Sequence, residues 1–108
     1  MQDYMSSSLF DIRGKKALVV GGTKGLGREM AFCLLENGCD VMAVSRDIKG
    51  NDEMTTYAKE NGTQFWLHSC DVLDSNAVVE MVQMAVAKMG RIDILINSAG
   101  RNITKMIE

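Results

Sequence analysis

The chain has 108 residues, of which 46% are hydrophobic and 24% charged, and its formal net charge is −2. This balance is typical of one folded globular domain and excludes disordered and fibrous chains. The pI is near 5.4 and charges of both signs are interspersed, so no basic surface for nucleic acid is expected. Local groups could still hold a small anionic ligand.

The cysteines and the histidine give no sign of a disulfide or metal site. Cys33, Cys39 and Cys70 lack CxxC spacing and lie in apolar stretches, which predicts reduced core thiols. His68 is the only histidine, so no metal is expected. The first eight residues lack the features of a secretory signal, and no apolar run is long enough to cross a bilayer. We therefore expect a cytoplasmic protein without membrane contact.

Short apolar runs alternate with helical patterns along the chain. After a polar lead-in over residues 1–14, the run Lys16–Val20 predicts a strand that is buried on both faces. A glycine-rich turn follows. Residues 26–37 then carry apolar side chains at helical spacing, and Gly38 suits the end of that helix.

The same order of elements then repeats. Residues 41–44 and 65–70 predict two more strands, with a weaker helix over residues 53–60 between them. Asp74 is a good helix N-cap, and residues 92–96 predict a fourth strand. Before that strand, six apolar side chains follow the spacing of one buried helix face: Val78, Val79, Val82, Ala85, Val86 and Met89.

Strands that alternate with helices in this way predict an α/β fold, a doubly wound parallel sheet with right-handed crossovers. The sheet is expected to be truncated after its fourth strand. That strand would then have an outer edge without a partner, and such edges favour association.

The most informative segment joins the first strand to the first helix and reads Gly21-Gly22-Thr23-Lys24-Gly25-Leu26-Gly27. Gly21 can take the tight turn, Gly25 lets the backbone approach a pyrophosphate, and Gly27 allows close helix packing. The phosphates would lie at the helix N-terminus, where free N–H groups face them. A flexible turn is the alternative interpretation, but the strand-turn-helix placement favours a phosphate site.

This glycine spacing resembles the Thr-Gly-x-x-x-Gly-x-Gly motif of the short-chain dehydrogenase/reductase family. Val20 stands where that family usually has threonine, so a hydroxyl that could brace the turn is missing. The resemblance implies a Rossmann-like fold in which residues 15–108 form an NAD(P)-binding half-domain. We expect the turn, including Thr23, Lys24 and Leu26, to contact the cofactor.

Two later segments and the lead-in match the same family in order. Asp71-Val72 resembles a pair that holds the adenine ring, and Asn97-Ser98-Ala99-Gly100 resembles the Asn-Asn-Ala-Gly motif with Ser98 in place of the second asparagine. The resemblance implies that Asn97 keeps the fourth strand in register and that Ala99 and Gly100 line the floor under the ribose and nicotinamide. Alone, Asp71 and Asn97 could each be ordinary turn residues. Residues 9–15 resemble the lead-in of members that act on sugar acids.

The residues after the second strand bear on the choice of cofactor. In NAD-selective sites an acidic residue there binds the ribose hydroxyls and repels a 2′-phosphate. This chain has Ser45 at that position, followed by Arg46, whose guanidinium can pair with a phosphate. Lys24 can reach the same phosphate from the other side. The sequence therefore predicts NADP. NAD is the alternative if the two cations are ordinary surface charges and Asp47 takes the acidic role.

Family members transfer a hydride to or from a small carbonyl or alcohol substrate with a Tyr-x-x-x-Lys pair and a serine. Neither Tyr4 nor Tyr57 has a lysine four residues later, where Ser8 and Asn61 stand. We therefore expect no catalytic residue in this chain. It would be the inactive, cofactor-binding half of a longer protein.

The favoured interpretation is thus part of an NADP-dependent oxidoreductase that is a homo-oligomer at full length. A stand-alone NADP-binding regulatory module without turnover is the alternative from another class. A methyltransferase of similar fold is disfavoured, because its ribose site needs an acidic residue where Ser45 and Arg46 stand.

Overall fold

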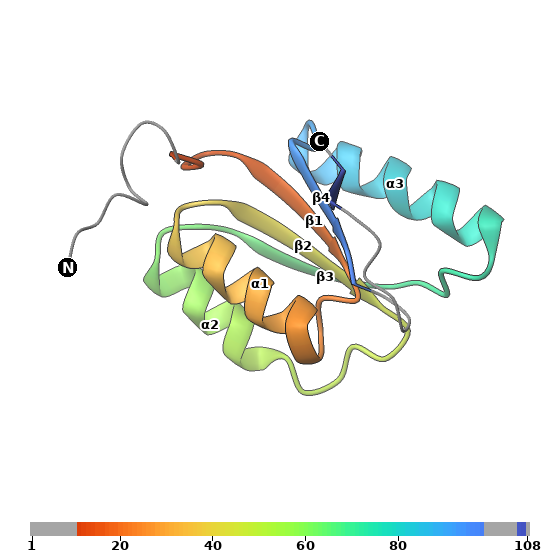
Figure 1. Cartoon of the computed structure of the whole chain (residues 1–108), viewed down its shortest axis with the longest axis horizontal. Coiled ribbons are helices and arrows are strands. Elements are labelled where there is room, and N and C mark those ends of the chain that lie inside the picture. The colour runs from red at the N-terminus through yellow and green to blue at the C-terminus, as the bar shows by residue number, and fades with distance from the viewer. Residues whose placement is uncertain (1–10, 99–105, 108) are drawn as a thin grey trace.

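The computed structural model describes residues 11–98 and 106–107 and shows a sheet with helices on both faces (Figure 1). Every predicted strand and helix is present, with boundaries that differ by at most two residues. In chain order the elements are β1 (Lys16–Val20), α1 (Gly25–Glu36), β2 (Asp40–Ser45), α2 (Asp52–Glu60), β3 (Phe65–Ser69), α3 (Ser75–Met89), β4 (Ile94–Asn97) and β5 (Met106–Ile107).

The strand order in the sheet is β3-β2-β1-β4-β5, and β1 to β4 are parallel. The chain winds outward from β1 through β2 to β3 and then crosses back to place β4 on the other side of β1. This reversal of direction leaves a crevice at the carboxyl ends of β1 and β4, which is where ligands bind in open α/β sheets.

The outer edge of β4 is not bare, which corrects the expectation of an unpaired fourth strand. β5 pairs with it in antiparallel orientation, with Leu95 opposite Ile107 and Ile96 opposite Met106. A strand of two residues shows no periodic pattern, so nothing in the sequence indicated it. The parallel part of the sheet still ends at the fourth strand, as predicted.

Two cores form because alternate side chains of each strand point to opposite faces of the sheet. Ala17 and Val19 of β1 pack in the cluster that includes residues of α1 and α2. Leu18 and Val20 pack in the cluster that includes residues of α3. Figure 1 shows α1 and α2 together on one face and α3 on the other. Both faces of β1 are therefore covered, which explains why every position in its run Ala17–Val20 is apolar.

The ends of α3 agree with the sequence signals. One carboxylate oxygen of Asp74 accepts hydrogen bonds from the N–H groups of Asn76 at 3.0 Å and Ala77 at 3.3 Å. Gly90 follows the helix with φ of +88°, a conformation that side chains rarely adopt. These two residues fix where the helix begins and ends.

The buried face of α3 differs from the predicted one. Met81, Ala85 and Met89 are buried against the sheet, and Val78 is partly buried beside them. Three of the valines predicted to be buried are instead exposed, with exposed fractions of 55%, 40% and 44%: Val79, Val82 and Val86. The helix carries two apolar stripes, so periodicity alone did not show which one faces the sheet.

The cysteine prediction holds for two of three thiols. Cys39 and Cys70 are buried, whereas Cys33 is exposed on α1. Burial raises the pKa of the Cys39 thiol to about 11, so it stays protonated at neutral pH. Among the described helices, none has the length and apolar character needed to span a bilayer.

Candidate nucleotide-binding site

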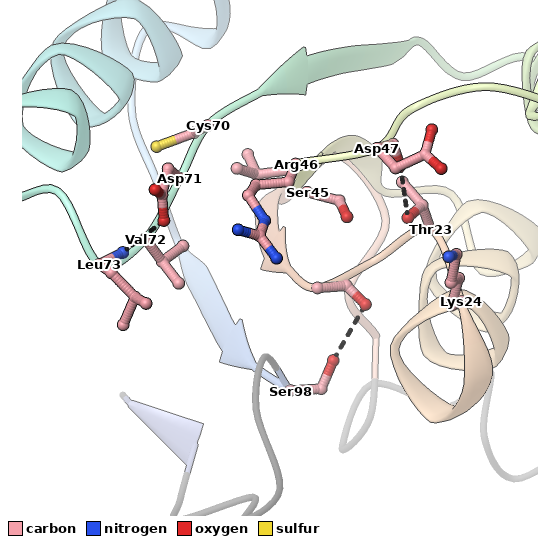
Figure 2. Close-up of a pocket in the computed structure, with 12 residues that line it drawn as sticks. Thr23, Lys24, Ser45, Arg46, Asp47, Cys70, Asp71, Val72, Leu73 and Ser98 are labelled. Atoms are coloured by element: carbon pink, nitrogen blue, oxygen red, sulfur yellow. Dashed lines mark hydrogen bonds between the residues drawn. The ribbon is translucent and has the colours of Figure 1, made fainter.

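A pocket of about 470 Å³ lies at the carboxyl ends of the parallel strands (Figure 2). Its walls come from the segments that follow β1, β2, β3 and β4, so residues far apart in the sequence meet there. The lining residues are Gly21, Thr23, Lys24, Val44, Ser45, Arg46, Asp47, Cys70, Asp71, Val72, Leu73 and Ser98.

Most of the predicted site residues meet in this pocket. Those that line it are Gly21, Thr23, Lys24, Ser45, Arg46, Asp71 and Val72. Four others are not part of the lining, namely Gly25, Leu26, Gly27 and Asn97. Ala99 and Gly100 lie outside the described residues.

The pocket also contains residues that were not proposed as cofactor contacts. These are Val44, Cys70, Leu73 and Ser98, together with Asp47, which was proposed only in the NAD alternative. All five lie within two residues of a predicted contact. This closeness in sequence was the feature that could have identified them as pocket residues.

The turn after β1 is built from main-chain groups. Gly21 has φ of +85°, and its N–H donates to the carbonyl of Val44 at 2.6 Å, which ties the turn to the end of β2. Gly25 has φ of +56°, and no atom lies within 4 Å of where its Cβ would be. The backbone at Gly25 is therefore open to a ligand, as the sequence predicts for a residue that approaches a pyrophosphate.

Gly27 is buried where α1 begins, and the space that a side chain would need is occupied. A Cβ at Gly27 would lie 2.2 Å from the carbonyl oxygen of Gly21 and 2.2 Å from the hydroxyl oxygen of Ser98. The sequence predicts close packing at this glycine, and the structure shows that the contact is with the turn and with Ser98.

Thr23 connects the glycine-rich turn to the segment after β2. Its side chain is 6% exposed, and its hydroxyl donates to the backbone carbonyl of Asp47 at 3.3 Å. The carboxylate of Asp47 accepts a hydrogen bond from the N–H of Lys49 at 3.1 Å. In Figure 2 this carboxylate points away from Arg46. Asp47 is therefore a turn carboxylate that also lines the pocket.

Two cations line the pocket. The side chains of Lys24 and Arg46 are exposed, and within residues 11–98 neither forms an ion pair. The hydroxyl of Ser69 donates to the backbone carbonyl of Arg46 at 3.0 Å and so holds this part of the loop. Figure 2 shows the Arg46 guanidinium on the side of Asp71 and Val72, while Lys24 stands beside Thr23. Both cations are available to an anionic ligand.

The segment after β3 forms the third wall. One carboxylate oxygen of Asp71 accepts a hydrogen bond from the N–H of Leu73 at 3.0 Å, so this residue is a turn carboxylate as well as a pocket residue. Val72 and Leu73 are 38% and 88% exposed. These apolar side chains could pack against the face of a flat ring.

Cys70 is the one thiol in the lining of this pocket. Burial raises its pKa, and the neighbouring Asp71 carboxylate raises it further. The group is therefore a protonated thiol at neutral pH and not a nucleophile. In the part of the chain that the structure describes, no group of three histidine, cysteine or acidic side chains could hold a metal ion.

Comparison with known proteins gives the family. Residues 15–108 match the family model for short chain dehydrogenases. The chain belongs to the short-chain dehydrogenase/reductase family. This confirms the resemblance to that family.

Individual members of the short-chain dehydrogenase/reductase family align over most of this chain. A 2-dehydro-3-deoxy-D-gluconate 5-dehydrogenase from Dickeya dadantii is 36% identical over 96 residues, which are 89% of this chain and 37% of that protein. The crystal structure of a short chain dehydrogenase from Mycobacterium smegmatis matches with a TM-score of 0.75 and 29% identity, over 84% of this chain and 39% of that one. The crystal structure of NAD+-bound xylitol dehydrogenase matches with a TM-score of 0.76 and 29% identity, over 83% of this chain and 35% of that one.

The chain spans about a third of the length of the curated relatives that it matches. The family match over residues 15–108 contains the glycine-rich turn and all the described strands.

Proposed function

We propose that this chain is the cofactor-binding part of an NADP-dependent oxidoreductase that reduces a carbonyl or oxidises an alcohol. One observation carries the proposal: the pocket joins the glycine-rich turn to Ser45 and Arg46, with no carboxylate in the position that selects NAD. A regulatory module without turnover is less favoured, because the relatives reported above are named as dehydrogenases.

The residues present suit a dinucleotide. The open backbone at Gly25 and the start of α1 would hold the diphosphate, since free N–H groups at a helix N-terminus attract anions. Asp71 and Val72 would hold the adenine ring and Asn97 the register of the fourth strand, while the resemblance to the family implies that Ala99 and Gly100 line the floor under the ribose and nicotinamide. When bound, the cofactor supplies or accepts the hydride.

The preference for NADP rests on Arg46 and Lys24. A planar guanidinium can pair with two phosphate oxygens and stack on adenine, and Lys24 adds a second charge. The relative xylitol dehydrogenase holds NAD+ in its crystal structure, so membership of the family does not by itself favour either cofactor. The two cations of this chain are what favours NADP.

A sugar acid is the first substrate class to test in the whole protein. The Dickeya dadantii relative is named for a sugar-acid substrate, and residues 9–15 resemble the lead-in of such members. The whole protein would be a homo-oligomer, as we infer from the family.

The test is the affinity of the Arg46→Ala variant for NADPH and for NADH, measured by calorimetric titration. Charge-assisted hydrogen bonds contribute roughly 1.5–3 kcal/mol each, so we expect affinity for NADPH to fall about tenfold or more. Affinity for NADH should change less than about twofold, since NADH lacks the phosphate whose contact is lost. Lys88→Ala removes an exposed cation on α3 and is the control. An equal loss for both cofactors, or no loss, would contradict the proposal.

A further inference from the structure

Ser98 lies where three backbone segments meet: the end of β1, the glycine-rich turn and the end of β4. Its hydroxyl oxygen is 3.2 Å from the carbonyl oxygen of Val20 and 3.2 Å from that of Gly21. Its N–H donates to the carbonyl of Val20 at 2.8 Å. Figure 2 shows the side chain directed toward the turn at the border of the pocket. One small side chain therefore contacts the turn from the neighbouring strand.

The carbonyl of Gly21 accepts a hydrogen bond from the hydroxyl of Ser98, which bears on the orientation of the peptide that follows Gly21. Gly21 has no side chain and takes φ of +85°, and glycine crosses between backbone conformations more easily than any other residue. The carbonyl carries the negative end of the peptide dipole, so a rotation that brought it toward an anionic group would weaken binding of that group. A hydroxyl that donates to the Gly21 carbonyl opposes this rotation.

Ser98 also limits how the start of α1 approaches the turn. A Cβ at Gly27 would lie 2.2 Å from the Ser98 hydroxyl oxygen, so the helix backbone passes directly against this side chain. The hydroxyl thus contacts both parts of the proposed diphosphate site, the turn and the helix N-terminus. Val20, which also lies in this corner, offers no hydroxyl of its own.

We propose that Ser98 is a positioning residue for the diphosphate of the cofactor. Its hydroxyl holds the Gly21 carbonyl and thereby the geometry of the turn, and it makes no contact with the substrate. This inference rests on the proposed function, because it needs a dinucleotide in the pocket. Ser98 is the residue that departs from the family's Asn-Asn-Ala-Gly motif, and the proposal gives it a task at the turn that follows the neighbouring strand.

The test compares two ligands in the Ser98→Ala variant of this chain by chemical-shift titration. ADP-ribose contains the diphosphate, whereas adenosine 2′-phosphate contains only the adenosine end of NADP. The dissociation constant for ADP-ribose should rise about three- to tenfold, the size expected for one lost hydrogen bond. That for adenosine 2′-phosphate should change less than about twofold. Ser75→Ala, at an exposed serine where α3 begins, is the matched control and should leave both constants unchanged.

Urea unfolding of the same variants separates positioning from general loss of structure. Equal weakening for both ligands, or unchanged ADP-ribose binding, would overturn the role of Ser98. If Ser98→Ala does not fold, Ser98→Cys replaces it, because a thiol has nearly the same shape but is a weak donor, and the same selective loss is expected.

The unaltered chain tests the proposed function separately. Failure to bind ADP-ribose would refute the dinucleotide site and the role of Ser98 with it. Binding of ADP-ribose but not of adenosine 2′-phosphate would refute only the preference for NADP. The selective loss of ADP-ribose affinity, in a variant whose urea transition shows that it is still folded, would then decide the role of Ser98.

Discussion

The residues that shape the pocket are small or connect main-chain groups. Gly27 leaves room for the Gly21 carbonyl and for Ser98, and the hydroxyl of Thr23 holds the carbonyl of Asp47. The long side chains Lys24 and Arg46 stand at the pocket and form no ion pair in the described part of the chain. The residues that shape the pocket are therefore different from those that supply its positive charge. Substitutions can change one set without the other.

Gly27→Ala should damage the site more than any loss of a single contact. The added Cβ would meet a backbone oxygen that cannot move without opening the turn, so we expect a destabilisation of about 1–3 kcal/mol and loss of ADP-ribose binding. Urea unfolding and chemical-shift titration measure the two effects. Gly62→Ala, in the turn between α2 and the start of β3 and at φ of +72°, is the control. It should cost about 1–2 kcal/mol from backbone strain alone and keep binding intact. Tight ADP-ribose binding by the Gly27 variant would show that the close approach is unnecessary.

Among the elements, α3 shows where a sequence pattern is ambiguous. It carries one apolar stripe through Met81, Ala85 and Met89 and a second that includes Val82 and Val86, but only the first packs on the sheet. Valine is the more hydrophobic of the two residues, so the side chains of the helix alone favoured the second stripe. Packing against Leu18 and Met42 from the sheet decided the outcome, and this information is not local to the helix.

Alanine substitutions on the two stripes should differ strongly in their effect on stability. Met81→Ala removes a side chain that is 2% exposed, and we expect a loss of about 2–5 kcal/mol in the free energy of unfolding. Val82→Ala changes a valine that is 40% exposed to a better helix former, so its stability should change by no more than about 0.5 kcal/mol. Urea denaturation of both variants gives the comparison. A Val82 variant as unstable as the Met81 variant would mean that the valine stripe is buried in solution.

The strands and the site differ in how much of them could be predicted. The first two strands were the easiest to predict, because burial on both faces makes their runs apolar, as in Ala17–Val20. The pocket walls were predicted from chain order, since the carboxyl ends of parallel strands meet at one edge of a sheet. The hydrogen bonds of Ser98 were not, because its partners Val20 and Gly21 lie 78 and 77 residues away in the chain. Such contacts depend on how elements far apart in the chain are placed relative to one another. Local sequence patterns contain no information about this placement.

At the scale of the whole molecule, the pocket lies where the segments that follow the four parallel strands come together. The turn after β1, the loops after β2 and β3, and the residue after β4 all contribute to it. Hydrogen bonds already join these segments in pairs: Gly21 to Val44, and Ser98 to Val20. A ligand that spans the pocket would contact segments from four strands at once, whereas the unfolded chain offers no such arrangement.

Binding should therefore stabilise the entire fold and not one loop. A ligand that binds only the folded state at a hundred times its dissociation constant adds about 2.7 kcal/mol to the free energy of unfolding. We expect ADP-ribose at that excess to raise the urea midpoint without changing the slope of the transition, because the surface exposed on unfolding stays nearly the same. The Gly27→Ala variant, with its turn disrupted, should show no shift at the same concentration. A midpoint that stays constant in the unaltered chain would mean that the four strand ends do not form a dinucleotide site, whatever their sequence resembles.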